Sequence, residues 1–343
     1  MSVMDTATHA ALGAAIGEAV LGKKIGNWAM LWGAVAGSLP DVDLALARFE
    51  DDVGSLTHHR GITHSLFFAL ILSAILGWLV SRWYRRHPAG TTPGNWGCLF
   101  SGCLLTHVLL DACTTYGTPL FLPFSPYRVA LNNIFIIDPL FTIPLLSSGV
   151  VCLFLSPRGR RRRLVNRAGL ALSLLYLSVT FVSRYHAQEV FAASLASQRI
   201  EAERFMTAPT PMNSILWYCI AEGRDGYHVG YYSLLDRARQ IRFRYVPRND
   251  ELIRDIKEDP SVERLVQFSK GYYAVRREEN RLVFDVLKFG MLTLDNGERQ
   301  VAYSFAILSD EHGAVTVKST MRRRDLDLGR LTAALWDGIW GQE

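Results

Sequence analysis

The sequence predicts a membrane bundle of about six apolar helices followed by a soluble α+β domain. Hydrophobic residues make up 49% of the 343 residues, and the mean hydropathy is slightly positive, which is more apolar than an ordinary soluble protein. Long apolar runs stop near Tyr185, and the sequence after it mixes polar and charged residues. Three regions are therefore expected: a transmembrane domain over residues 1–185, an amphipathic connecting helix over 186–206 and an α+β domain over 207–343.

Four apolar runs are close to the ~20 residues that a helix needs to cross a hydrocarbon core. They cover residues 65–84, 96–113, 134–155 and 164–183. Two shorter runs, 8–21 and 28–39, contain the stretches GAAIG and GAVAG. Small residues four apart let helix backbones approach closely in lipid, so these two runs are expected to form a packed pair.

Lysine and arginine residues in the short loops predict the orientation of the helices. When successive helices cross the membrane in alternating directions, the loops on one side hold only Arg48, Arg60 and Arg128. The opposite set holds eleven basic residues, namely Lys23, Lys24, Arg82, Arg85, Arg86, Arg158, Arg160, Arg161, Arg162, Arg163 and Arg167. We expect the eleven-residue set to be cytoplasmic, which places the region after Tyr185 on the outer side of the membrane.

Charge and cysteine content argue against two other classes of protein. The net charge of +5 does not indicate nucleic-acid binding, because the basic residues concentrate in short loops, above all RGRRRR at 158–163, where they act as a topology signal. Four of the five cysteines lie in apolar segments and no CxxC pair occurs. Neither a disulfide framework nor a thiolate zinc site is therefore expected.

Ionisable residues occur where a membrane domain rarely contains them. The set comprises His9, Asp41, Asp43, His58, His59, His64, His107, Asp111 and Asp138. An aspartate inside a membrane helix costs about 2.5–3.5 kcal/mol, so such residues usually have a partner or a function. The orientation assigned above used only lysine and arginine, yet it puts each of these ionisable residues at or near the outer end of its helix. A bound metal ion would be a suitable partner.

The spacing of these residues also favours a metal site. His107 and Asp111 are four residues apart, so on a helix both side chains lie on one face. In LPDVD, at 39–43, the proline breaks the apolar run, and an extended backbone would direct Asp41 and Asp43 to the same side.

The stretch HHRGITHS at 58–65 adds His59 and His64 around a glycine turn, with Arg60 between them. Imidazole and carboxylate ligands without thiolate suit a divalent ion, zinc first and otherwise manganese or iron, and bridging carboxylates favour two or more ions. The predicted metal ligands are His9, Asp41, Asp43, His59, His64, His107 and Asp111.

Each part of this pattern also has a simpler interpretation. His9 alone is typical of a polar residue with a local partner, and the HxxxD spacing is compatible with a hydrogen bond within one helix. The DxD pair could end a helix, although two acids at a helix C-terminus oppose the helix dipole. His58 is expected not to contact the metal, because its neighbour His59 points to the opposite side of an alternating backbone. Asp138 is expected to cap a helix or form a pair outside the metal set.

Taken together, the motifs resemble those of bacterial inner-membrane proteins known as membrane-bound metal-dependent hydrolases. The resemblance covers residues 4–157 and rests on THAALGAAIG, LPDVD, HRGITHS, HVLLDACTTYGTPLFLPFS and IDPLF, in this order. It implies functional roles for His9, Asp41, Asp43, His59, Arg60, His64, His107 and Asp111. The pattern of an early histidine, an aspartate, a later histidine and an HxxxD helix is also similar to that of zinc-dependent phospholipase C, which favours phosphoesters as substrates.

These observations predict hydrolysis of a lipid or lipid-linked phosphoester at the outer face of the membrane. Arg60 and Asp43 are the predicted catalytic residues, and Arg60 is expected to bind phosphate through two parallel hydrogen bonds. A non-enzymatic membrane protein with a structural metal site and a partner-binding periplasmic domain is the alternative. Ion transport is a third possibility, but transport would require polar residues that continue toward the inner side. The pattern identifies no protein partner.

The region after residue 206 has the alternating pattern of β-strands, in stretches such as SILWYCIA and QVAYSFAIL. Helices are expected over residues 250–269 and 328–340, which makes this region an α+β domain. His228 and His312 are isolated, so no catalytic cluster is expected there.

Overall fold

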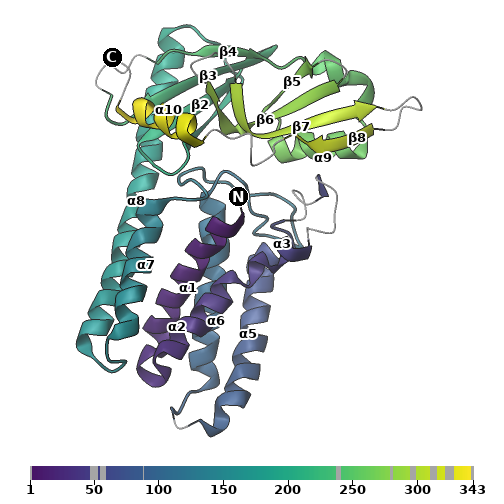
Figure 1. The fold of residues 1–343 in the computed structure, drawn as a ribbon. Coiled ribbons are helices and arrows are strands. Elements are labelled where there is room, and N and C mark those ends of the chain that lie inside the picture. Colours follow the sequence, from purple (N-terminus) through teal and green to yellow (C-terminus); the bar gives the residue numbers. More distant parts are fainter. Residues whose placement is uncertain are drawn as a thin grey trace. The chain divides into compact units, whose positions relative to one another are not determined.

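The computed structural model of the chain divides into two compact units, each described by itself below. It describes residues 2–46, 53–54, 59–87, 89–236, 241–278, 281–293, 299–309, 315–320 and 328–340. The first unit is helical and comprises Met1–Arg48, His58–Leu131 and Ile136–Thr180 (Figure 1). The second unit comprises the remaining residues and contains two β-sheets (Figure 1).

A helix is present at each of the six predicted segments. The elements of the helical unit are α1 (Ser2–Ile25), α2 (Asn27–Ser38), η1 (Pro40–Val42), α3 (Asp43–Leu46), η3 (Ile62–His64), α5 (Leu66–Trp83), η4 (Tyr84–Arg86), α6 (Pro93–Cys113), α7 (Pro139–Phe154) and the first part of α8 (Arg160–Ser197). Three segments among the described residues are long and apolar enough to cross a membrane, namely Leu66–Arg86, Pro93–Cys113 and Arg160–Ser197, and α7 is a shorter apolar helix. Membrane spans are thus supported, whereas the predicted count of six is not confirmed.

Local sequence explains where the helices begin. Ser65 accepts a hydrogen bond from the backbone of Phe68 at the start of α5, and Thr92 forms a capping box with Asn95 at the start of α6. Asp138 caps α7 by accepting a hydrogen bond from Leu140 N, so this helix starts at Pro139 rather than at the predicted residue 134.

The predicted pairing of the two small-residue helices is confirmed. A Cβ atom at Gly13 would collide with the carbonyl oxygen of Gly33, and one at Gly37 would collide with that of His9. Helices α1 and α2 therefore pack backbone to backbone, as glycines four residues apart allow in lipid. The contact brings the C-terminal end of α2 against His9 on α1.

Helix α8 is one continuous helix of 38 residues. The sequence predicted two separate elements here, a span over 164–183 and a connecting helix over 186–206. No proline or glycine occurs between Gly169 and Ser197, so nothing interrupts the helix. It ends at Ser197, before Arg199 with a φ angle of 55°, and strand β1 begins at Arg204.

Two antiparallel four-stranded sheets form the second unit, with the orders β1–β2–β3–β4 and β5–β6–β7–β8. The strands are β1 (Arg204–Pro209), β2 (Leu216–Glu222), β3 (Gly226–Ser233), β4 (Arg244–Pro247), β5 (Tyr273–Glu278), β6 (Arg281–Thr293), β7 (Arg299–Ser309) and β8 (Val315–Ser319). The helix expected over 250–269 is split into η5 (Asp250–Ile256) and α9 (Pro260–Ser269), because Pro260 starts a new helix after the Asp259 cap. The closing helix is α10 (Leu328–Trp340), drawn in yellow in Figure 1.

The core of the second unit includes a cluster of buried side chains from both sheets, among them Tyr218, Ile220 and Tyr227 of the first sheet and Leu287 and Val301 of the second. The predicted α+β composition is thereby confirmed. The predicted metal ligands all belong to the helical unit and not to this second unit.

Candidate metal centre

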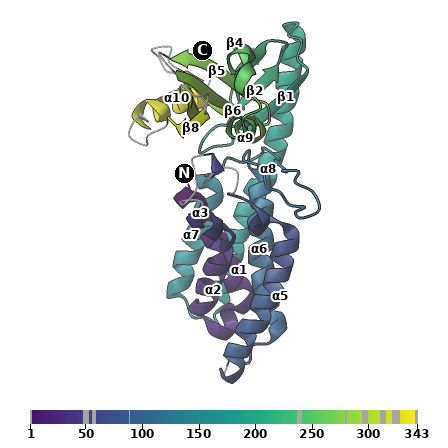
Figure 2. The ribbon, with the colours of Figure 1, turned by 90° about the vertical axis from the view of Figure 1, so that its right-hand side faces the viewer.

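Side chains from four helix ends meet at one end of the helical unit. His9 lies in α1, Asp41 in η1 directly after α2, His64 in η3 directly before α5, and His107 and Asp111 in the last two turns of α6. This is the end at which α1 begins and α6 finishes, visible next to α3 in Figures 1 and 2. Residues far apart in sequence are therefore adjacent in space, as the sequence analysis expected.

Four ligand-type atoms of this group are separated by similar distances. His64 Nε2 lies 3.2 Å from His107 Nε2 and 3.3 Å from Asp111 Oδ2. His107 Nε2 lies 3.6 Å from the same Asp111 oxygen, and Asp41 Oδ1 lies 3.6 Å from both histidine nitrogens. Ligands bound tetrahedrally at about 2.0–2.1 Å are about 3.4 Å apart, so the spacing fits one zinc-sized ion.

The tautomer of His107 follows from its neighbour on α2. His107 Nδ1 lies 2.7 Å from the carbonyl oxygen of Gly37, which can only accept a hydrogen bond, so Nδ1 carries the hydrogen. In a neutral ring, Nε2 then has a lone pair that faces His64 Nε2 and the carboxylates. Metal-binding histidines commonly donate their second N–H to a backbone carbonyl in this way.

His64 is oriented by the same principle. The Thr63 hydroxyl donates its single hydrogen to Asp43 Oδ2, at 3.0 Å. His64 Nδ1 lies 3.0 Å from Thr63 Oγ1 and 3.3 Å from Asp43 Oδ2, and both atoms present lone pairs to it. Nδ1 therefore carries the hydrogen, and His64 Nε2 presents a second lone pair to the centre.

The two carboxylates each direct one oxygen into the centre and bind a partner with the other. Thr6 donates a hydrogen bond to Asp41 Oδ2 at 3.0 Å. Asp111 Oδ1 lies 2.9 Å from a terminal nitrogen of Arg60. Asp111 Oδ2 is buried and accepts no hydrogen bond from any residue that the structure describes. Two nitrogen lone pairs facing carboxylate oxygens repel each other unless a cation lies between them, so these residues fit a metal ion.

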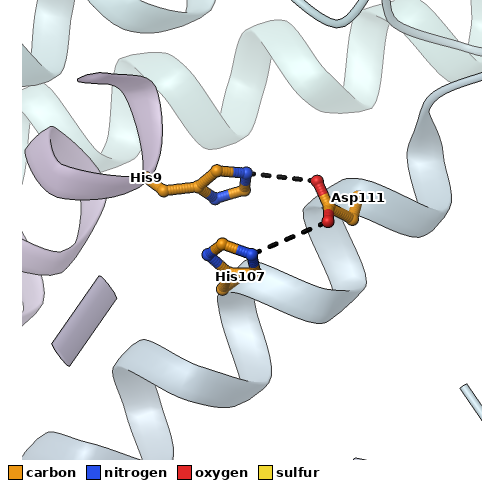
Figure 3. Close-up of side chains that lie close together, drawn as sticks. All are labelled: His9, His107 and Asp111. Atoms are coloured by element: carbon orange, nitrogen blue, oxygen red, sulfur yellow. Dashed lines mark hydrogen bonds and ion pairs between the residues drawn. The ribbon is translucent and has the colours of Figure 1, made fainter. Parts of the chain in front are cut away.

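His9 lies against the same centre (Figure 3). Its ring stacks on that of His107 with centroids 3.7 Å apart, and its Nε2 lies 3.1 Å from Asp111 Oδ1. The trio His9, His107 and Asp111 has the proximity needed for an ion, as does the trio Asp41, His64 and His107. His107 has only one nitrogen left for a ligand bond, so the two trios describe one centre. The expectation of two or more ions stays a prediction.

Asp43 and His59, two further predicted ligands, lie beside the centre. Asp43 Oδ2 accepts hydrogen bonds from the backbone of Arg60 and from Thr63, and Asp43 Oδ1 lies 3.2 Å from His59 Nδ1. Both oxygens of Asp43 thus bind the 59–64 segment. Burial raises the pKa of Asp43, but the hydrogen bonds from His59 and His64 outweigh it and hold the pKa below its usual range. Asp43 is an anion that orients two histidines.

The charge balance of the centre favours a cation. Burial alone would lower the pKa of His64, but the hydrogen bonds to Asp41 and Asp43 raise it above its ordinary value. Burial likewise raises the pKa of Asp41, yet the contact with His64 leaves it below normal. The surrounding carboxylates therefore stabilise a positive charge at His64, as a proton on Nε2 when no metal is bound and as a metal ion when one replaces that proton.

Arg60, the predicted phosphate ligand, is 1% exposed and directed at Asp111. Its NH1 donates to the backbone carbonyl of Asp111 at 3.2 Å and to Thr114 Oγ1 at 2.9 Å, and its guanidinium lies 4.8 Å from the centroid of the Tyr116 ring. A cation at the C-terminal carbonyls of α6 also complements the helix dipole. The geometry favours Arg60 as the residue that holds Asp111 in place.

The remaining predicted positions lie apart from the centre or outside the described residues. His58 lies outside the described residues. Asp138 caps α7, as expected, and also accepts a hydrogen bond from the Tyr176 hydroxyl.

Sequence reasoning missed the groups that orient the ligands. The carbonyl of Gly37 has no side-chain signal, and Thr6 and Thr63 are common residues at unremarkable spacing.

The fold and the centre together define a helical membrane protein with a buried histidine and aspartate cluster. A profile of the YdjM inner membrane protein family matches residues 4–187, more than half of the chain. The chain belongs to this family, the family of membrane-bound metal-dependent hydrolases, so the resemblance is confirmed, and an inner-membrane location follows.

Two relatives support this assignment. The chain is 33% identical over 156 residues to the uncharacterized protein YfhP of Bacillus subtilis, which covers 42% of this chain and 45% of YfhP. It is 34% identical over 112 residues to the inner membrane protein YbcI of Escherichia coli, which covers 32% of this chain and 61% of YbcI. The chain thus spans less than two thirds of the length of either relative. No solved structure matches.

Proposed function

We propose that the protein is a metal-dependent hydrolase of a lipid or lipid-linked phosphoester at the outer face of the inner membrane. The observation that carries the proposal is the convergence of four ligand atoms, from His64, His107, Asp41 and Asp111, on one buried gap. The second polar atom of each residue is held by another group, as is typical of a preorganised metal site.

A divalent ion held by these residues would supply Lewis acidity for hydrolysis of a phosphoester. Two imidazoles and two carboxylates suit zinc, and they also suit manganese or iron. An ion can bind between these residues only when Nε2 of both His64 and His107 carries no hydrogen. The contact of His107 Nδ1 with Gly37, and those of His64 Nδ1 with Thr63 and Asp43, favour that tautomer by holding the hydrogen on Nδ1.

Asp43 and His59 are arranged to accept a proton beside the centre. Because the Asp43 carboxylate accepts hydrogen bonds, His59 Nδ1 donates to it and His59 Nε2 keeps its lone pair. The His59 side chain is 15% exposed, in contrast to the fully buried His64, and the centroids of the two rings are 5.8 Å apart. In this proposal His59 takes the proton of the attacking water, and Asp43 orients and stabilises the imidazolium that forms.

The distribution of basic residues supports the outer face. Lys23 and Lys24 lie in the last turn of α1, Arg82 lies in the last turn of α5, and α8 begins with four arginines. These are the opposite ends of the helices from those that carry the centre. By the positive-inside rule, this distribution supports a periplasmic position of the centre in the proposal.

A structural metal site is the second candidate, and the burial of the centre favours it. His64, His107 and Asp111 are at most 1% exposed, and structural zinc sites are closed by four protein ligands, whereas catalytic sites keep one position open. Asp41 is the most exposed of the four ligands. A hydrolase requires that substrate reaches the ion from the side of Asp41, whereas a structural site requires no such access.

Metal analysis of the purified full chain, combined with a screen of phosphoester and lipid substrates, tests the proposal. We expect at least one ion per chain and turnover of a lipid phosphoester that is lost together with the metal. Bound metal without turnover of any phosphoester would favour the structural site. A chain that binds no divalent metal would exclude both candidates.

A further inference from the structure

The exposed side of helix α8 changes from apolar to polar within the second unit. Phe181, Val182 and Tyr185 are exposed, whereas the next exposed residues, Gln188 and Glu189, are polar. The helix that contains them, Arg160–Ser197, is long and apolar enough to cross a membrane. Tyrosine is enriched where a spanning helix meets the lipid headgroups. This change therefore predicts that α8 leaves the membrane near Tyr185.

One end of the first sheet lies beside this part of α8. His186 Nε2 lies 3.3 Å from the hydroxyl of Tyr232, near the end of β3. At the opposite end of the sheet, Arg204 pairs with Glu222, and β1 begins there only after α8 has ended at Ser197. The end formed by residues 210–216 and 232–235 is thus nearer to the apolar part of α8, and it is called the membrane-proximal end of the sheet below.

Helix α10 is attached to this membrane-proximal end. The hydroxyl of Ser233, at the end of β3, donates a hydrogen bond to the carbonyl of Ile339. A Cβ atom at Gly338 would lie 2.8 Å from Leu216 Cδ2, so α10 packs closely on the strand that pairs with β3. Leu335 of the same helix is buried. One side of α10 is therefore occupied by its contact with the sheet.

The exposed side of α10 carries two tryptophans. Trp336 and Trp340 are 62% and 61% exposed, and their rings meet edge to face with centroids 5.7 Å apart. Because they are four residues apart, both lie on one face of the helix. Large aromatic side chains stabilise a protein mainly through the apolar surface that they bury, in a core or at an interface. In the part of the chain that the structure describes, more than half of each residue stays uncovered.

Other exposed apolar side chains also concentrate at the membrane-proximal end. Met212 lies in the connection between β1 and β2, and Leu235 follows β3 directly. Four of the six exposed large hydrophobic residues described after α8 belong to this end, and the full set is Met212, Leu235, Tyr245, Leu308, Trp336 and Trp340. Exposed apolar surface of this kind marks an interaction site. Its position beside the apolar part of α8 favours lipid as the partner.

We propose that α10 and the adjoining turns form a lipid-binding surface, in which Trp336 and Trp340 insert into the leaflet from which α8 emerges. The partner is the headgroup and upper acyl-chain region of the surrounding phospholipid bilayer. Tryptophan suits this region because its ring is apolar and its indole N–H can donate to water or to headgroups. The contact attaches the second unit to the membrane through α10 as well as through α8. It is independent of the proposed hydrolase activity.

Fluorescence quenching of the full chain in proteoliposomes of phosphatidylcholine and phosphatidylglycerol tests this contact. The label is a bimane on Ala333→Cys, at an exposed position of α10, in a background with the exposed Cys98 replaced by serine. Lipids with a nitroxide near the headgroup should quench this label strongly. The matched control is a label on Tyr245→Cys, because Tyr245 is exposed at the opposite end of the same sheet. Nitroxide lipids should leave that label nearly unchanged.

Removal of both indoles should abolish the effect. In the Ala333→Cys background, Trp336→Ser combined with Trp340→Ser should reduce quenching to the level of the label at position 245. Trp336→Phe combined with Trp340→Phe should keep most of the quenching, since phenylalanine remains apolar. Both positions are exposed, so all variants should unfold in detergent at nearly the same temperature.

Two results would overturn the proposal without any need for the double variants. The first is equal quenching of the labels at positions 333 and 245. The second is a label at position 333 that aqueous iodide cannot reach but nitroxide lipids do not quench, which would show that a second copy of the chain covers α10. Quenching at position 333 that persists after both serine substitutions would also overturn it, because the tryptophans would then not mediate the contact.

Discussion

Arg162 of α8 and Glu18 of α1 form a buried ion pair with two hydrogen bonds of 2.7 and 2.6 Å. The Arg162 side chain is fully buried and also donates to Asn27 Oδ1 at 2.7 Å. Arg162 belongs to the four consecutive arginines that sequence analysis treated as a topology signal, yet it links α8 to α1 and to the start of α2. The neighbouring Arg161 is exposed.

Loss of the Glu18 charge should destabilise the helical unit. Glu18→Gln leaves a buried guanidinium without its counter-charge, which typically costs about 3–5 kcal/mol in the free energy of unfolding. Arg161→Gln should change it by less than about 0.5 kcal/mol, as expected at an exposed position. Thermal unfolding of both variants in the same detergent gives the comparison. Equal melting temperatures for the two variants would show that the pair contributes nothing.

Substitution of a metal ligand should reduce metal binding more than substitution of a residue that orients a ligand. His64→Ala and His107→Ala each remove a ligand atom and should reduce the bound metal to near zero under conditions that saturate the wild type. Asp43→Asn removes only the anion that orients His64, and should weaken metal affinity by about 10- to 100-fold. Metal titration with a competing chelator measures both effects. If Asp43→Asn lost the ion as completely as His107→Ala, Asp43 would be a ligand.

Substitution of Arg60 should weaken metal binding, because Arg60 holds a metal ligand and does not contact the substrate itself. Arg60→Gln removes the buried charge that holds Asp111, so we expect weaker metal affinity and a lower melting temperature. A direct phosphate ligand would behave differently, because its loss would leave metal affinity and melting temperature unchanged while phosphate binding fell. Measurement of all three quantities on one preparation distinguishes these roles.

The orientation can be tested with single cysteines in a background with the exposed Cys98 replaced by serine. Arg161→Cys should be protected from a membrane-impermeant thiol reagent in intact spheroplasts, whereas Arg224→Cys in the second unit should react. Both positions are exposed, so both should react after the membrane is permeabilised. Reaction at position 161 and protection at position 224 would invert the topology and move the metal centre to the cytoplasmic side.

Much of the helical unit could be predicted because the signals are local. Apolar run length indicated where helices lie, although the predicted count of six membrane spans is not confirmed, and the glycine spacing predicted the α1–α2 contact. The boundaries were less accurate, since Asp138 delays the start of α7 and the absence of a breaker extends α8 to Ser197. The second unit was predicted as α+β, but the pairing of its strands into two separate sheets depends on contacts between distant residues.

The sequence by itself determined which residues belong near the centre, because burial of ionisable groups among apolar helices is costly enough for each of them to stand out. Only the tertiary structure decided what each residue does there. Asp41 and Asp43 are chemically identical and two residues apart, yet Asp41 faces the two histidine lone pairs while Asp43 is surrounded by donors of the 59–64 segment. The positions of donors on other elements, such as the guanidinium of Arg60 and the hydroxyls of Thr6 and Thr63, determine which oxygens remain for a metal ion. Those positions depend on helix packing, which no local pattern specifies.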